Sequence, residues 1–379
     1  MRTAIFTSPG DYHAHAASWG LRQRGHECEL LYFNDFPQMA SLDIHVSQDR
    51  CSVRSSNSDL DWKKFDTIWL RRPDKAVVGK ELHETDRKVA ATDWSFTLDT
   101  VLQMISLDEA FVVNPSGSLL HGRLKPYHLA LAARAGLNIP RTLISNSSSE
   151  IISFIQHNAG HGQKTIVKGF QPTIWELDGG NAGIFSTIHV EQSDIERSDM
   201  RSAPCIFQQA IEKRYEVRVC VYGETLFALE INSQDNEETL VDFRLTTDWS
   251  RFSYRMLDIP SEVRSGILSF QKTLGLNFGA MDFIVDKSDD WIFLETNVMG
   301  NFLWMECFNS EAPLLDALVD FLISRSDSFQ YDIKKQSRLT TSDFEKSLGR
   351  NPHVFFEEER NAHVEIPIPV LSESTRQLI

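Results

Sequence analysis

Two short apolar segments decide the fold: GAMDFIV at residues 279–285 and WIFLETN at residues 291–297. A polar turn separates them, which predicts two antiparallel strands joined as a hairpin. Each strand carries one acid, Asp282 or Glu295, among large apolar neighbours; an unpaired carboxylate there would be costly, which argues against a solvent-facing hairpin with incidental acids. Asn297 lies two residues beyond Glu295 and shares its face, because side chains alternate along a strand. Two carboxylates and an amide oxygen on one face suit Mg²⁺, which prefers hard oxygen ligands and keeps its other positions for water and phosphate.

Cationic side chains upstream of the hairpin are of the kind that bind phosphate groups. Lys125 begins a predicted helix, and Lys168 ends a predicted strand at 165–169. That strand leads into the glycine-bearing segment 170–186, which we predict to be a mobile loop. Each lysine taken alone is more simply explained as a surface charge, so their order along the chain carries the argument.

The polar stretch that follows the next apolar strand has two parts. Gln208, Gln209 and Ile211 are placed to offer backbone groups to the edge of a base. Beyond them, Glu216 and Arg218 belong to a charged cluster that also contains Lys213. A salt-bridged strand edge explains this cluster as well as a functional site does.

Apolar patterning divides the 379 residues into three predicted units and an extension. A β-α-β opening and a strand at 67–70 predict an α/β domain over residues 1–115. Residues 116–204 follow as a second α/β unit, and residues 205–325 are β-rich. Residues 326–379 are polar and weakly patterned, and we treat them as a C-terminal extension. The predicted fold class is α/β. The number of predicted units agrees with the usual size of ~100–200 residues per domain.

The composition excludes several classes of protein. The formal net charge of −15, from 53 acidic and 38 basic residues, would repel a phosphate backbone, so we expect no nucleic-acid partner. No apolar run approaches ~18 residues, so we expect no membrane span. The five cysteines lie far apart, as reduced thiols do in cytoplasmic proteins, and we expect this location. The sequence has no P-loop, GxGxxG or GxSxG motif.

In this order the elements resemble the ATP-grasp fold: a helix-opening lysine, a strand lysine before a glycine-bearing loop, a hinge, an arginine on the next strand, and the acidic hairpin. Within that superfamily the chain resembles the microviridin-type, or graspetide, peptide ligases, over roughly residues 1–325. The matching stretches are IWLRRP at 68–73, GLNIPRTLISN at 136–146, DFR at 242–244 and ETNVMGNFLWME at 295–306. The chain departs from the family at Phe243, where Trp is usual, and at residues 301–302, where Gln-Trp is usual.

The resemblance implies an ATP- and Mg²⁺-dependent ligase with an N-terminal α/β domain, a central α/β lobe and a C-terminal β-rich lobe. Such enzymes phosphorylate a side-chain carboxylate of a ribosomally made precursor peptide. A Ser or Thr hydroxyl or a Lys amine then attacks the acyl phosphate and closes an ester or amide ring. Related ligases also suggest a homodimer. Two alternatives stay open: a ligase that joins a free amino acid to a peptide or protein terminus, and a non-catalytic nucleotide- or peptide-binding regulator.

The resemblance also implies roles for single residues. For metal and nucleotide these are Lys125 and Lys168 at the phosphates or the adenine edge, Gln208, Gln209 and Ile211 at the adenine, Glu216 at the ribose, Arg218 at the transferring phosphoryl group, and Asp282, Glu295 and Asn297 at Mg²⁺. Arg244 should grip the peptide carboxylate bidentately, with Asp242 orienting it from two residues away on the same strand face. The alternative for this pair is an exposed ion pair on a strand edge. Arg71 and Arg72 end a buried-looking strand, and we expect at least one of them to tie strand ends together or to contact the peptide.

Overall fold

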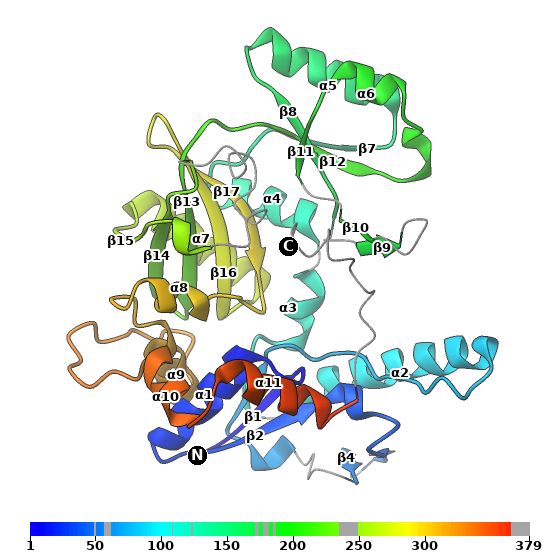
Figure 1. Ribbon diagram of the computed structural model, residues 1–379, viewed down its shortest axis with the longest axis vertical. Coiled ribbons are helices and arrows are strands. Elements are labelled where there is room, and N and C mark those ends of the chain that lie inside the picture. The colour runs from blue at the N-terminus through cyan, green and yellow to red at the C-terminus, as the bar shows by residue number, and fades with distance from the viewer. Residues whose placement is uncertain are drawn as a thin grey trace.

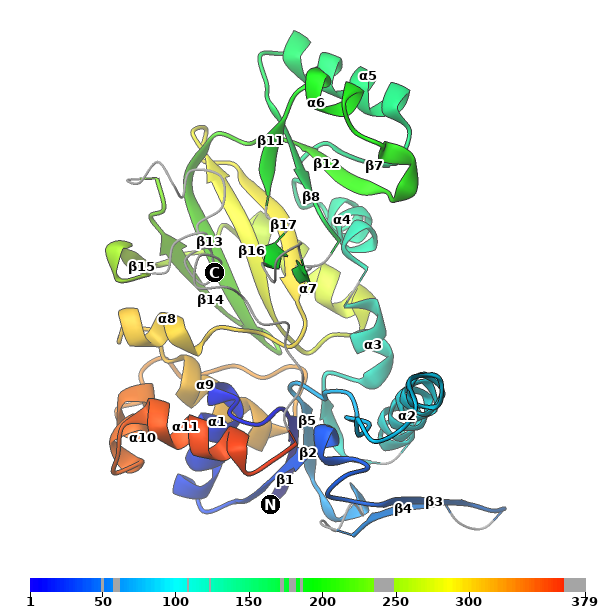
Figure 2. The ribbon, with the colours of Figure 1, turned by 45° about the vertical axis from the view of Figure 1, so that its right-hand side comes forward.

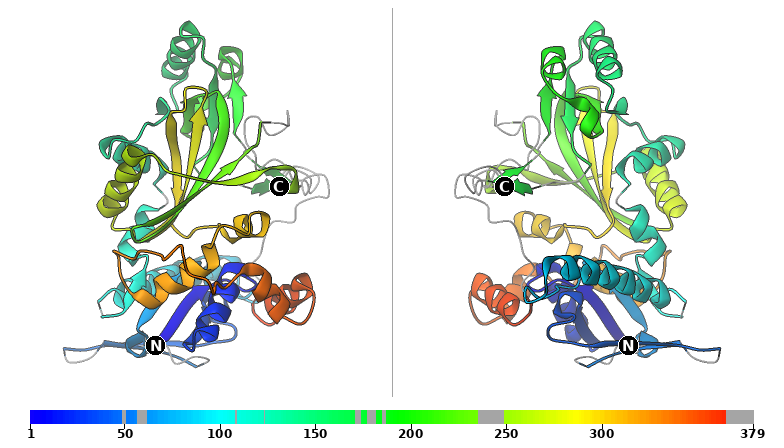
Figure 3. Two further views of the ribbon diagram at one scale, coloured as in Figure 1. Left: turned by 90° about the vertical axis from the view of Figure 1, so that its left-hand side faces the viewer. Right: turned by 90° about the vertical axis from the view of Figure 1, so that its right-hand side faces the viewer.

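The computed structural model describes residues 1–48, 51–56, 62–107, 109–122, 124–170, 174–176, 182–184, 187–234 and 249–364. These residues form three main sheets, arranged one above another along the long axis of the molecule (Figure 1). Views from the two sides show the same order, with a four-stranded antiparallel sheet at one end, a five-stranded sheet in the middle and a parallel sheet at the other end (Figure 3). None of the described helices is long and apolar enough to cross a membrane.

The parallel sheet contains the first strands of the chain. Its order is β2 (Glu27–Tyr32), β1 (Arg2–Thr7), β5 (Thr67–Leu70) and β6 (Phe111–Val113). Side chains of β1 alternate between two cores, so that α2 (Glu84–Ile105) covers one face and α1 (Tyr12–Gln23) with α9 (Leu314–Ser324) covers the other. We call this sheet with α1 and α2 the N-terminal layer. The predicted β-α-β opening is confirmed, and Gly25, at φ +79°, follows the end of α1 as expected.

The four-stranded antiparallel sheet has the order β11 (Ile188–Val190), β8 (Thr165–Lys168), β12 (Cys205–Gln209) and β7 (Thr142–Ser145). Helices α5 (Ser148–Gly160) and α6 (Gln192–Glu196) pack on it around a small core that includes Ile151, Val167 and Phe207. This sheet lies above the five-stranded sheet in the view of Figure 2.

The five-stranded sheet is antiparallel and carries the candidate site. Its order is β15 (Tyr254–Leu257), β14 (Thr225–Ile231), β13 (Lys213–Tyr222), β16 (Phe278–Asp286) and β17 (Trp291–Asn297). One face is apolar, and Phe283 and Phe293 pack there against Phe270 of α7 (Ser261–Leu274). Helix α4 (Lys125–Arg134) lies beside β17, and Phe293 N donates to Asn138 O at 2.8 Å.

Several segments differ from what the sequence predicts. Residues shortly before Lys125 form α3 (Ser116–His121), a helix that the sequence analysis does not predict. The glycine-bearing segment contains two paired strands, β9 (Ile174–Glu176) and β10 (Ala182–Ile184), so it is not simply a loop. The remaining elements are the hairpin β3 (Leu42–Val46) and β4 (Cys51–Ser55), α8 (Leu303–Phe308), α10 (Thr341–Ser347), α11 (Pro352–Asn361), and 3-10 turns at Phe33–Asp35, Trp62–Lys64, Met200–Ser202 and Trp249–Arg251.

The extension after residue 325 is ordered through α11, contrary to its weak patterning. Its helices α10 and α11 pack on α1, with Phe344 and Phe356 buried against Tyr12. Glu306 of α8 accepts hydrogen bonds from the backbone of Leu315 and Thr341, both at 2.7 Å, and burial raises the pKa of its carboxyl to about 7. The extension is therefore fixed by tertiary contacts rather than by a periodic pattern of its own.

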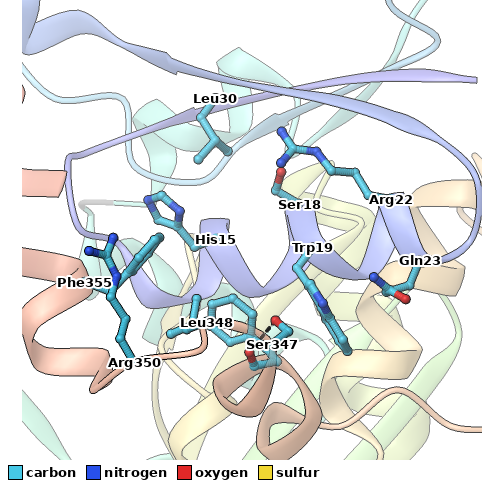
Figure 4. A pocket seen from close by; sticks show the side chains of 11 residues that line it. His15, Ser18, Trp19, Arg22, Gln23, Leu30, Ser347, Leu348, Arg350 and Phe355 are labelled. Carbon is cyan, nitrogen blue, oxygen red and sulfur yellow. Dashed lines mark hydrogen bonds between the residues drawn. The ribbon is translucent and has the colours of Figure 1, made fainter.

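A pocket of about 720 Å³ lies between the extension and α1 (Figure 4). Its walls include Trp19, Phe344 and Phe355, and its rim includes Arg22 and Arg350. No side chain that the sequence predicts to be functional lines it.

Candidate active site

A row of charged side chains crosses the open face of the five-stranded sheet. Arg218 on β13 lies directly opposite Asp282 on β16, which lies opposite Glu295 on β17. Arg218 Nη1 donates to Asp282 Oδ1 at 2.6 Å, and the side chains of these two residues are 8% and 20% exposed. Neighbours directly across a sheet share a face, so all three side chains point away from the apolar core.

A β-bulge at Leu294 makes this row possible. Phe283 pairs with Phe293, but the preceding residue Asp282 pairs with Glu295, so β17 has one residue more than β16 at this point. Strict alternation from the buried Phe293 would place Glu295 on the core side. The extra residue returns Glu295 to the open face, opposite Asp282.

Asn297 and Lys125 complete the cluster. Asn297 pairs with Ala280, and its Nδ2 donates to Asp282 Oδ2 at 3.2 Å. Lys125, at the start of α4, forms an ion pair with Glu295, with 2.9 Å between Nζ and Oε2. The expectation that the two acids and the amide share one face is confirmed, as is the place of Lys125 at a helix start.

The donor set fits Mg²⁺ in its chemistry. Carboxylate and amide oxygens are the hard ligands that this ion takes, usually with few protein groups and several waters. Among the described residues, no group of three or more His, Cys, Asp and Glu side chains is close enough to hold a metal. Asn297 adds an amide oxygen beside the two carboxylates of Asp282 and Glu295.

A second charged group lies further along the same face. Glu216 Oε1 accepts from Lys213 Nζ at 2.7 Å and from Ser233 Oγ at 3.0 Å. The salt bridge of the structural alternative is present between Lys213 and Glu216, but β13 is the third of five strands, so the cluster does not lie on an edge strand of the sheet. Since β13 residues 216 and 218 share a face, Glu216 lies beside Arg218.

Two residues of the four-stranded sheet that the sequence predicts to bind the nucleotide, Lys168 and Gln208, differ in their surroundings. Lys168 ends β8, half-buried and opposite Ile206 on β12. Gln208 is buried, and its Nε2 donates to Thr142 Oγ1 at 2.8 Å, so its side chain braces β12 against β7.

Gln209 is the last residue of β12, and a short connection leads from it to β13. The backbone N–H of Gln209 donates to Arg141 O at 3.0 Å, and Ile211 lies between the two sheets along the chain. An adenine contact by either residue stays a prediction. Asp242 and Arg244 lie outside the described residues.

The two strand-end arginines separate in the structure. Arg71 is buried, and its Nη1 donates to the carbonyl oxygens of Met299 and Gly300, at 2.8 and 2.6 Å. Arg72 is exposed, with 59% of its side chain accessible and 4.0 Å from Nη1 to Asp11 Oδ2. The structural version of the prediction holds for Arg71, which ties the N-terminal layer to the loop directly after Asn297.

Sequence reasoning missed three buried polar residues at this junction: Asp11, His13 and Asn114. Their partners lie far away along the chain; His13, for example, accepts from the backbone N–H of Phe302, 289 residues later. The sequence carried one usable signal, a histidine and an asparagine in apolar surroundings, since buried polar groups need partners.

Comparisons with known proteins bear on the fold. No protein-family model and no curated protein matches the sequence. Solved structures do: the macrocyclase MdnC from Microcystis aeruginosa, with its precursor peptide MdnA, has a TM-score of 0.75 at 22% identity, over 86% of this chain and 100% of that one. An ATP-grasp ligase associated with peptide modification in Chryseobacterium gregarium, in complex with ADP and a leader and core peptide, gives 0.75 at 22% identity, over 86% and 97%. The ATP-grasp ligase PsnB, with a precursor variant, Mg and ADP, has a TM-score of 0.66 at 22% identity, over 85% of this chain and 98% of that one.

This chain therefore has the ATP-grasp fold, and the predicted fold class is confirmed. The uncovered share of the chain, about 14%, is as large as the extension 326–379.

Proposed function

We propose that the protein is an ATP-dependent ligase that activates Asp or Glu side-chain carboxylates of a precursor peptide and closes ester or amide macrocycles. The observation that carries the proposal is the row Arg218, Asp282 and Glu295, with Lys125 and Asn297 beside it, on the open face of an ATP-grasp sheet. The similar structures of MdnC and PsnB, which hold a precursor peptide or its variant, favour a peptide as substrate.

Each residue of the candidate site has its own role in the proposed phosphoryl transfer. Asp282, Glu295 and Asn297 would hold Mg²⁺, which when bound would neutralise charge on the phosphate oxygens. Arg218 stabilises the negative charge that develops on the transferring phosphoryl group, a contribution that such arginines make in other phosphotransfer enzymes. Lys125, on α4, and Lys168, on β8, would bind the phosphates.

The reaction has two steps, because a carboxylate is a poor electrophile at neutral pH. A carboxylate oxygen of the peptide attacks the γ-phosphorus and ADP leaves. A Ser or Thr hydroxyl or a Lys amine then attacks the acyl carbon, loses its proton, and inorganic phosphate leaves. Arg244, oriented by Asp242, would hold the carboxylate for in-line attack. The four-stranded sheet with β9 and β10 would cover the nucleotide and exclude water from the acyl phosphate.

We further propose a cytoplasmic homodimer in which residues 1–115, 116–204 and 205–325 are the three units of the ATP-grasp enzyme. Light scattering of the purified chain tests the dimer, and a monomer at micromolar concentration would contradict it.

Mass spectrometry with a synthetic peptide tests the function. The peptide carries clustered Thr, Ser and Lys with Asp and Glu, as precursor cores do, and is incubated with ATP and Mg²⁺. Each ring closed removes the mass of one water and releases one ADP and one phosphate. Peptide-stimulated ADP release with no loss of water, but with a free amino acid added to a terminus, would favour the alternative ligase. ATP binding without turnover would favour a non-catalytic regulator, if it holds for every peptide tried. These include the peptides encoded by the open reading frames next to the gene.

A further inference from the structure

The loop after β17 is held by side chains of the N-terminal layer. Arg71 donates from Nη1 to two successive carbonyl oxygens, those of Met299 and Gly300, at 2.8 and 2.6 Å. These residues begin two positions beyond Asn297. Gly300 has φ +64°, and an added Cβ would lie 2.8 Å from the Phe278 ring, so the loop turns closely against the sheet.

His13 holds the next part of the same loop. Its Nε2 accepts from the backbone N–H of Phe302 at 2.9 Å and of Leu303 at 3.1 Å, which caps α8. An acceptor at Nε2 requires the neutral ring, and burial together with the charge of Arg71 lowers the pKa of His13 well below its ordinary value. Asn114 adds a bond from Nδ2 to Val298 O at 2.7 Å.

Asp11 holds Arg71 in place. Its Oδ2 lies 3.4 Å from Arg71 Nη2, and its Oδ1 accepts from Ala14 N at 3.0 Å at the start of α1. Burial alone would raise the pKa of the Asp11 carboxyl, but the charge of Arg71, with a smaller contribution from the hydrogen bond that Ala14 N donates, keeps it below the ordinary value. The Asp11 and Arg71 side chains are 2% and 3% exposed, so the pair is fixed within the protein rather than moving in solvent.

The backbone groups that Arg71, His13 and Asn114 bind in this loop all lie within the six residues after Asn297. Mg²⁺ tolerates little deviation from octahedral geometry, and a site displaced by about 0.5 Å or more loses function. A guanidinium that grips two carbonyl oxygens at the end of β17 limits how far the ligand-bearing strand can move. Hydrogen bonds in which one partner is charged are stronger than those between neutral groups, which suits them to this role.

We propose that Arg71, held by Asp11, is a positioning residue: it fixes the end of β17 so that Glu295 and Asn297 meet Mg²⁺ in the required geometry. The inference rests on the proposed function, and it assigns to the N-terminal layer a part in metal binding without contact with the metal. A purely structural tie would affect stability but not the dependence of nucleotide binding on Mg²⁺.

The test measures ADP affinity by isothermal titration calorimetry at a series of Mg²⁺ concentrations. Arg71→Met should raise the Mg²⁺ concentration for half-maximal enhancement of ADP binding at least tenfold, and leave ADP affinity without Mg²⁺ unchanged. Arg71→Lys, which keeps a cation and part of the bonding, should lie between. Hydrogen exchange of residues 298–303 should speed up in Arg71→Met.

The matched control is Arg24→Met. Arg24, directly after α1, likewise pairs with a buried acid, Asp316, with 2.6 Å from Nη2 to Oδ1, but Asp316 lies on α9. The Arg24→Met variant should lower Tm about as much as Arg71→Met does. It should leave the dependence of ADP binding on Mg²⁺ unchanged.

An unchanged Mg²⁺ dependence in Arg71→Met, with faster exchange in the loop, would overturn the positioning role and leave the proposed function intact. A shift of equal size in Arg24→Met would also overturn it, because any loss of stability would then suffice. If Arg71→Met does not fold, Asp11→Asn replaces it, and the expected shift is about threefold; no shift there overturns the role. Wild-type protein that binds no ADP at any Mg²⁺ concentration would instead refute the proposed function.

Discussion

Asp282 is the centre of the candidate site, and Asp282→Asn is the substitution that tests it most directly. The carboxylate accepts from Arg218 at 2.6 Å and from Asn297 at 3.2 Å. Asparagine has the same shape and still offers an oxygen to Arg218, but it removes a full negative charge from the proposed metal site. Folding and chemistry should therefore respond very differently.

The expected effects follow from the contacts. A hydrogen bond between charged groups contributes about 1.5–3 kcal/mol, and part of it survives with the neutral amide, so stability should fall by about 1–2 kcal/mol. In a chain of this length that lowers Tm by about 2 °C. Outer partners of metal ligands cost about 10–100-fold when removed, so a direct ligand should cost at least about 100-fold in ATP turnover.

The assay is ADP release from ATP, with Mg²⁺ varied to saturation, beside thermal unfolding of the same samples. Glu230→Gln is the control, because Glu230 also pairs with an arginine on this sheet, Arg255, with 2.5 Å between Oε2 and Nη2, but has no proposed part in the chemistry. Its turnover should stay at the wild-type value. Asp282→Asn that turns over ATP at the wild-type rate in saturating Mg²⁺ would refute the metal assignment.

Three further predictions concern other parts of the chain. Below pH 7 the folded state keeps a proton on Glu306 that the unfolded state loses near its ordinary pKa of 4.5, so this group destabilises the fold progressively as pH rises from about 4.5 to 7. The Tm of wild type relative to Glu306→Gln should fall across that window, and a constant difference would contradict the shift. Phe356→Ala should cost about 3–5 kcal/mol in denaturant unfolding while ATP turnover per folded molecule is unchanged; a smaller loss would mean that the extension does not depend on this contact. Arg244→Lys should keep ATP affinity and Tm but abolish peptide-stimulated ADP release, and normal cyclisation would assign the carboxylate to another residue.

Elements with strong boundary signals could be predicted to the residue. The strands predicted at 67–70 and 291–297 occur as β5 and β17, with the same bounds. Helices α3, α10 and α11 were missed because segments of six to ten residues show no clear period, and short helices depend on tertiary packing.

The parts of the candidate site that depend only on spacing within one strand could be predicted from the sequence. The spacing from Glu295 to Asn297 places both on one face whatever the rest of the chain does. Arg71 shows the limit, because its carbonyl partners lie 228 and 229 residues away, and nothing in a single sequence pairs them. The bulge at Leu294 was equally hidden, since an unbroken apolar strand predicts plain alternation.

The bulge residue Leu294 divides β17 into two halves that face different surroundings. Trp291–Phe293 packs in the interior, with the Phe293 ring 5.2 Å from that of Phe270, whereas Glu295 and Asn297 face the candidate site. Because the backbone offset at Leu294 sets the phase of the second half, substitutions that repack the first half need not turn the acid away from its partners. Over evolutionary time the interior and the chemistry of this strand can change separately, provided that one residue always stands between Phe293 and Glu295.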